Sequence, residues 1–227
     1  HFHSLWMNDE FRQLVLNGIG WTAGVEIPES GIDGKLPEPA HQSIDKAIAA
    51  GTADDVKLLL TLNPGLAHQG DSSRGPLDVA ILRNKPEIVQ VLLAFGSDPD
   101  GAEGASRSPL HLAVNRKSPG MTAALLAAGA KPDRLDKGGW TPLHNAAAEN
   151  QLETAKVLLA GGANPMTLSE LGGTPLHEAA TGGSAELIQL FLDAKVDPTI
   201  KSKQGVTALD LAKEYKNQAA IDILSKL

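Results

Sequence analysis

The 227-residue chain contains no cysteine, and only 4% of its residues are aromatic. Without cysteine, no disulfide framework, thiolate metal site or cysteine nucleophile can form. With so few aromatic side chains, the core must be built from Ala, Leu, Val and Ile, which suits short, closely packed helices and does not suit a β-sandwich. These two scarcities exclude disulfide-stapled domains and several classes of enzyme.

The chain also lacks a long apolar run and an excess of positive charge. No apolar stretch approaches the length of a membrane span, and the N-terminus has no basic region followed by an apolar core, so we expect a soluble, cytoplasmic protein without membrane contact. The net charge of −7 disfavours general attraction to nucleic acid. Gly-rich phosphate loops, Gly-x-Ser-x-Gly elbows, His-Glu-x-x-His motifs and EF-hand spacings are missing, so we expect no cofactor, metal or catalytic residue.

One motif returns every 33 residues, and its clearest copy is Thr141, Pro142, Leu143 and His144. The positions equivalent to Pro142 are Ser43, Pro76, Pro109, Pro142, Pro175 and Ala208. The next residue is always aliphatic, and the residue three positions after that is always Ala. A fixed interval without insertions predicts a stack of similar units.

Each copy of the motif predicts the start of a helix. Thr141 suits the N-cap, Pro142 suits the first helical position because its missing N–H would be unpaired there, and His144 falls where its side chain can reach back to the cap. The same reasoning makes Ser108 with His111 and Thr174 with His177 structural caps, and puts Asp45, Asp78 and Asp210 at the position of His144. At the helix ends, we expect left-handed residues at Gly96, Gly129, Gly162, Asn63 and Lys195.

This motif and its interval resemble the ankyrin repeat over residues 41–227. The resemblance implies an all-α solenoid of six stacked helix-turn-helix units with projecting hairpin loops, whose first and last repeats act as caps. It implies a non-catalytic module that binds another, folded protein on its concave face. Two alternatives stay open, a bacterial protein that neutralises a toxin and an interaction domain of a larger enzyme.

The remaining segments depart from the repeat. Residues 1–40 form a separate N-terminal segment, in which residues 1–6 are interpreted as a tag remnant or, alternatively, a metal-binding terminus. The spacing of Phe11, Leu14, Val15 and Ile19 predicts a helix that covers the first repeat or docks a partner, followed by an irregular connection. In the third repeat, Pro119 predicts a second helix that starts at or after this residue and is shorter or looser than its neighbours. The aliphatic pairs of the second helices, such as Leu92 and Leu93, are expected to face inward.

Function in a repeat protein is expected at positions that the scaffold does not fix. Arg and Trp often carry binding energy at interfaces, and several stand at such positions. The predicted partner-binding residues are Arg74, Arg83, Arg107, Arg116, Trp140, Asn145, Glu149, Leu171 and Glu178. We expect a monomer whose partner protein has an acidic or mixed-charge surface. The alternatives are an Arg116–Glu149 ion pair, a Trp140 ring lying flat on a neighbouring hairpin, and nucleic-acid binding through the arginines.

Overall fold

The computed structural model describes residues 43–68, 74–102 and 105–227, and Ser43–Leu227 form one compact unit. The predicted N-terminal helix near Phe11 and the connection after it lie outside the described residues, so the boundary at residues 40 and 41 stays a prediction. Within the described ranges the secondary structure consists of twelve α-helices and one 3₁₀-helix, with no strand. The predicted all-α class is confirmed.

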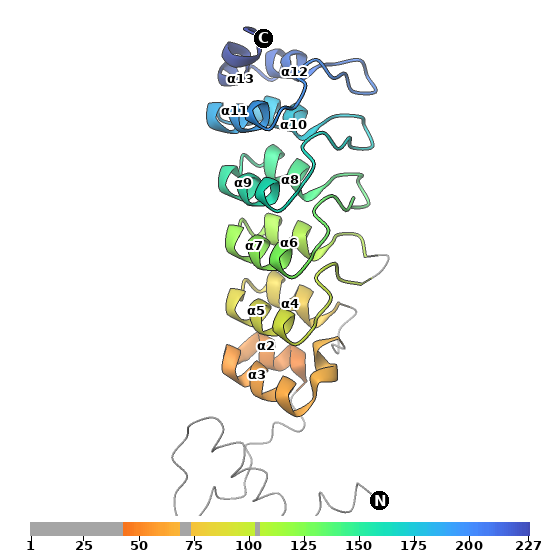
Figure 1. Ribbon diagram of the computed structural model, residues 1–227, viewed down its shortest axis with the longest axis vertical. Coiled ribbons are helices and arrows are strands. Elements are labelled where there is room, and N and C mark those ends of the chain that lie inside the picture. The colour runs from red at the N-terminus through yellow and green to blue at the C-terminus, as the bar shows by residue number, and fades with distance from the viewer. Residues whose placement is uncertain (1–42, 69–73, 103–104) are drawn as a thin grey trace, which may run out of the picture. The chain divides into compact units, whose positions relative to one another are not determined.

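The α-helices come in six consecutive pairs, which stack in sequence order (Figure 1). The pairs are α2 (Ile44–Ala50) with α3 (Ala53–Leu62), α4 (Pro76–Leu82) with α5 (Pro86–Ala94), α6 (Pro109–Asn115) with α7 (Pro119–Ala127), α8 (Pro142–Ala148) with α9 (Leu152–Ala160), α10 (Pro175–Gly182) with α11 (Ala185–Asp193), and α12 (Ala208–Glu214) with α13 (Gln218–Leu224). The 3₁₀-helix η2 (Pro64–Ala67) follows α3. The first helices lie beside the projecting hairpins, and the second helices lie on the opposite side (Figure 1).

In α6, α8 and α10, the capping motif both starts the helix and ties it to the next repeat. In α8, the Thr141 hydroxyl accepts the His144 N–H at 3.3 Å, while His144 Nδ1 accepts the Thr141 N–H at 3.3 Å. With Nδ1 accepting, the Nε2–H is free to donate, and it lies 3.1 Å from the Gly173 carbonyl of the next hairpin. His111 and His177 repeat this arrangement one repeat before and one after.

The first repeat differs from its prediction at two positions. Ser43 is the N-cap of α2 and accepts the Lys46 N–H, so Asp45 lies at the second helical position instead of the capping position. Asn63 has φ −143° and ψ 88°, which makes the predicted left-handed end wrong. The reason is Pro64, because the ring of a proline pushes the preceding residue toward extended backbone. At the other predicted helix ends φ is positive, from 63° at Lys195 to 93° at Gly129.

The second helix of the third repeat starts at Pro119 as predicted, but its predicted shortening is wrong. Helix α7 has nine residues, the same number as α5, α9 and α11. Pro119 occupies the first helical position, where no N–H is needed, and the Ser118 hydroxyl accepts the Met121 N–H at 3.3 Å. The proline therefore begins a full helix.

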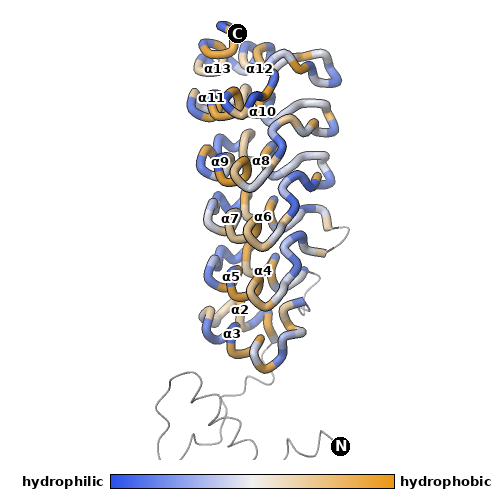
Figure 2. Tube along the Cα trace, viewed as in Figure 1, coloured by the Kyte–Doolittle hydropathy of each residue, from blue (hydrophilic) through white to orange (hydrophobic). Residues whose placement is uncertain are grey.

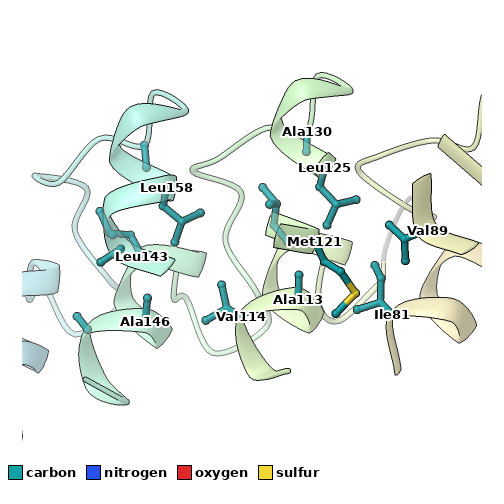
Figure 3. Packing of buried hydrophobic residues seen from close by; sticks show 14 of the residues in the cluster. Ile81, Val89, Ala113, Val114, Met121, Leu125, Ala130, Leu143, Ala146 and Leu158 are labelled. Atoms are coloured by element: carbon teal, nitrogen blue, oxygen red, sulfur yellow. The ribbon is translucent and has the colours of Figure 1, made fainter. Parts of the chain in front are cut away.

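The core runs along the stack between the helix pairs. The first member of each aliphatic pair is buried, whereas the second member is only half-buried in every pair except the first. Figure 3 shows Met121 of α7 pointing toward Ile81 and Val89 of the preceding pair. Small side chains such as Ala113 and Ala146, both fully buried, allow the first helices to approach closely. The hydrophobic parts of the chain accordingly lie mainly along the helices (Figure 2).

Gly139 is the turn residue whose conformation the fold requires most clearly. Its φ is +71°, and a Cβ there would lie 2.1 Å from Glu170 Cγ. We expect Gly139→Ala to lower the free energy of unfolding by about 1–2 kcal/mol, because a left-handed backbone disfavours a Cβ. Urea denaturation followed by circular dichroism measures this. The matched control is Gly120→Ala in α7, where a Cβ meets nothing within 4 Å and should stabilise the helix slightly. Equal effects at both positions would contradict the account.

Candidate partner-binding surface

The first helices and the hairpins form one face of the described unit (Figure 1). The last three hairpins are each closed by a backbone hydrogen bond, as between the Asp136 N–H and the Trp140 carbonyl at 2.8 Å. Neighbouring hairpins are also joined, because the Lys137 N–H donates to the Ser106 carbonyl and the Glu170 N–H donates to the Gly139 carbonyl. The side chains on these loops are therefore held by a connected framework.

Three of the four predicted arginines line a single groove between the second and third repeats. This arginine groove has a volume of about 690 Å³. Arg74 and Arg107 come from equivalent positions one repeat apart, and Arg116 follows α6. Asp78 also lines the groove, and Leu82 and Leu112 are among its apolar lining residues. Arg83, the C-cap of α4, is exposed and is not among the residues lining the groove.

Positive charge exceeds negative charge in the arginine groove. Arg107 Nε lies 3.7 Å from Asp136 Oδ2, but the Arg107 side chain is still 51% exposed. Burial raises the pKa of Asp78, and the positive charge of Arg74 acts in the opposite direction. The Arg116 side chain is exposed and forms no ion pair with any residue that the structure describes. The groove therefore suits a negatively charged group.

Trp140 lies at the root of its hairpin with its backbone fixed on both sides. Its N–H donates to Asp136 Oδ1 at 3.0 Å, and its carbonyl is 2.9 Å from His111 Nε2. The indole is half-buried and faces the His144 ring at a centroid distance of 6.2 Å and an interplanar angle of 36°. Asp136 thus holds the tryptophan through its backbone and lies beside Arg107, which joins these two predicted residues in one network.

Two predicted residues of the fourth and fifth repeats, Asn145 and Glu178, are more enclosed than the arginines. Asn145 of α8 is 9% exposed, and its Nδ2 is buried without a hydrogen-bond partner in the described part of the chain. Glu178 of α10 stands at the equivalent position one repeat later and is half-buried. Burial raises the pKa of its carboxyl. The carboxyl of Glu178 is therefore the more accessible of the two polar groups.

Glu149 pairs with a different residue from the one that the sequence suggested. Glu149 Oε2 lies 3.6 Å from Lys117 Nζ and accepts from Gln151 Nε2 at 3.0 Å, so the alternative pairing with Arg116 is wrong. Lys117 directly follows Arg116 and has a left-handed backbone, with φ 53°. The pair is largely exposed and contributes at most about 1 kcal/mol.

Sequence reasoning named Leu171, which is 56% exposed, but missed Leu135 and Leu168 on neighbouring hairpin segments. Both are large, apolar and about half exposed. The available signal was their common position in successive repeats, where the other copies have Ala102 and Lys201. A scaffold that accepts Ala and Lys at this position does not need leucine there.

A second depression, of about 720 Å³, lies among Asp98, Asp100, Lys131, Asp133 and Arg134. Lys131 Nζ is 3.7 Å from Asp100 Oδ2, and Arg134 donates to the Asp100 backbone carbonyl. These contacts join the second and third hairpins.

The helix pairs define a helical repeat solenoid, and the comparison with known families identifies which one. A model of ankyrin repeats in three copies matches residues 77–169, and a model of ankyrin repeats in many copies matches residues 158–212. The chain belongs to the ankyrin repeat family. Ankyrin repeats are generally protein–protein interaction modules and are typically non-enzymatic. The search of curated proteins gave no significant match. Within the described ranges, no helix has the length and apolar character needed to cross a membrane.

Proposed function

We propose that the chain is a non-catalytic binding module whose first-helix and hairpin face docks a folded partner with an acidic or mixed-charge surface. The observation that carries the proposal is the arginine groove, which three arginines from two neighbouring repeats line. The repeat scaffold does not require arginine at these positions. A guanidinium group binds carboxylates through two parallel hydrogen bonds, so the groove favours acidic side chains.

The surface beyond the groove supports a mixed partner rather than a purely acidic one. The exposed part of Trp140 offers a rigid aromatic contact, and Arg and Trp are over-represented among residues that dominate binding energies. Glu178 adds a half-buried carboxyl in the fifth repeat, and Asn145 adds a nearly buried amide in the fourth. Contact across the second to fifth repeats would let one folded partner use both the positive and the polar part of the face.

The test compares three immobilised baits in lysate of the cells that make the protein. The baits are the wild type, an Arg107→Glu, Trp140→Ala variant, and a control variant with Lys156→Glu and Gln189→Ala on α9 and α11, the side away from the hairpins. We expect a protein that wild type and control retain equally, and whose affinity for the first variant is at least about tenfold weaker by calorimetry. Equal affinity for all three baits, or no retained protein, would contradict the proposal.

A further inference from the structure

Large exposed apolar side chains gather on two neighbouring hairpin loops. Eight such side chains are exposed in the described residues, and four of them lie between residues 135 and 171. These four, called the hairpin patch, are Leu135 (48% exposed), Met166 (43%), Leu168 (51%) and Leu171 (56%). Single exposed apolar residues are ordinary on protein surfaces, whereas a group of them marks an interaction site.

Contacts between the two loops place Leu135 and Leu168 on adjacent segments. On one side of the pair, the Asn164 N–H donates to Asp133 Oδ1 at 2.9 Å. On the other side, the Glu170 N–H donates to the Gly139 carbonyl at 3.3 Å. Leu135 lies between Asp133 and Gly139 along its loop, and Leu168 lies between Asn164 and Glu170 along the next. Because the two bonds join the loops on both sides of the leucines, the exposed leucines stand on adjacent, connected segments.

Cations stand on both sides of the hairpin patch along the stack. Arg107 and Arg116 precede it, and Lys201 and Lys203 follow on the next hairpin. The two lysines and Lys137 are exposed, and their ammonium groups form no ion pair with the residues that the structure describes. The exposed acids near the patch are Glu170 and, on the hairpin of the two lysines, Asp197, and the exposed cations outnumber them. The surroundings are thus predominantly positive, in contrast to the net charge of −7 of the whole chain.

We propose that the hairpin patch binds a large apolar side chain of a partner segment whose flanking side chains are acidic. This inference rests on the proposed function and specifies the chemistry of the partner. The flanking carboxylates would face the arginine groove and the hairpin lysines, while the apolar side chain is covered by Leu135 and Leu168. A second copy of the same patch fits less well, because an isologous contact would bring these cations against their own equivalents.

The probe is a displayed library of random short peptides, selected on the full chain. We expect the enriched peptides to carry Leu, Ile, Met, Phe or Trp flanked by Asp or Glu. They should bind a Leu135→Ser, Leu168→Ser variant at least about tenfold more weakly than wild type. The matched control is Leu58→Ser, Leu62→Ser on α3, where the leucines are similarly exposed, at 40% and 44%. Its affinity should equal that of wild type, and thermal unfolding of every variant checks the fold.

An Arg107→Glu, Arg116→Glu variant separates this inference from the proposed function. Peptides that lose affinity for the arginine variant but not for the leucine variant overturn the hairpin patch and leave the proposed function standing. Affinity that neither variant changes overturns both. A library without enriched peptides, or with enriched peptides that lack apolar residues, overturns the patch. The patch proposal is also overturned if analytical ultracentrifugation shows that the wild type is a dimer and the leucine variant is a monomer. The patch would then bind a second copy of the chain.

Discussion

Phe191→Ala is expected to lower the free energy of unfolding by about 3–5 kcal/mol, because it removes a large buried side chain and leaves a cavity. Phe191 is 0% exposed, and its helix α11 packs against α9 and α13. In a stack with nearest-neighbour cohesion, the loss falls on the last helix pairs, so these should unfold at a lower urea concentration than the rest.

Circular dichroism across a urea titration measures both effects. The matched control is Leu192→Ala, one residue further along α11, where the side chain is only half-buried. We expect this change to cost less than half as much as Phe191→Ala. If the two substitutions lowered the free energy of unfolding equally, burial of side chains between the helix pairs would not be what stabilises the C-terminal repeats.

Acidification is expected to destabilise the stack through the buried histidines. Burial lowers the pKa of His144 from 6.5 to about 4, despite the hydrogen bond to the Gly173 carbonyl, which acts in the opposite direction. Below the ordinary pKa of histidine, the His144 imidazole takes up a proton in the unfolded chain but stays neutral in the folded chain. The contribution of neutral His144 to the free energy of unfolding is therefore fully present above pH 6.5 and falls as the pH drops toward 4. At pH 5, His144 alone accounts for a loss of about 2 kcal/mol.

The test compares wild type with His144→Gln in urea titrations at pH 7 and pH 5. The glutamine cannot take up a proton in this range, so the stability difference between the two pH values should shrink by about 2 kcal/mol. Burial also lowers the pKa of His111 and His177, whose effects remain in both proteins. The raised pKa values of Asp78 and Glu178 act in the opposite direction, which is why the variant comparison is informative. An unchanged pH dependence would contradict this assignment.

The sequence predicted the fold because one local motif recurs without insertion. The cap formed by Thr141 and His144 depends only on residues three positions apart. The histidine of the cap then bonds to a carbonyl at the equivalent position of the next hairpin, here that of Gly173. Asn63 shows where the pattern fails, since the proline after it outweighs the repeat position. Pro119 shows the opposite error, because a proline that seemed disruptive occupies the one helical position that tolerates it.

The surface was less accessible to sequence reasoning, since it depends on which loops meet. The repeat offsets placed Arg74 and Arg107 one repeat apart, but only the structure brings Arg116 into the same groove. The same offsets suggested a partner of Glu149 that the geometry replaces with Lys117. Leu135 and Leu168 occupy equivalent repeat positions that can be read from the sequence. Their proximity, however, follows from the contacts of Asp133 and Gly139 with the next loop.

The most direct measurement of the binding face introduces a photo-crosslinking amino acid at Trp140, Leu168 and Gln189 in three separate variants. Gln189 is exposed on α11, on the side away from the hairpins, and serves as the control. After irradiation in lysate, one partner protein should be crosslinked from the first two positions and not from Gln189. A partner captured as efficiently from Gln189, or from that position alone, would contradict the account and move the binding surface to the second helices.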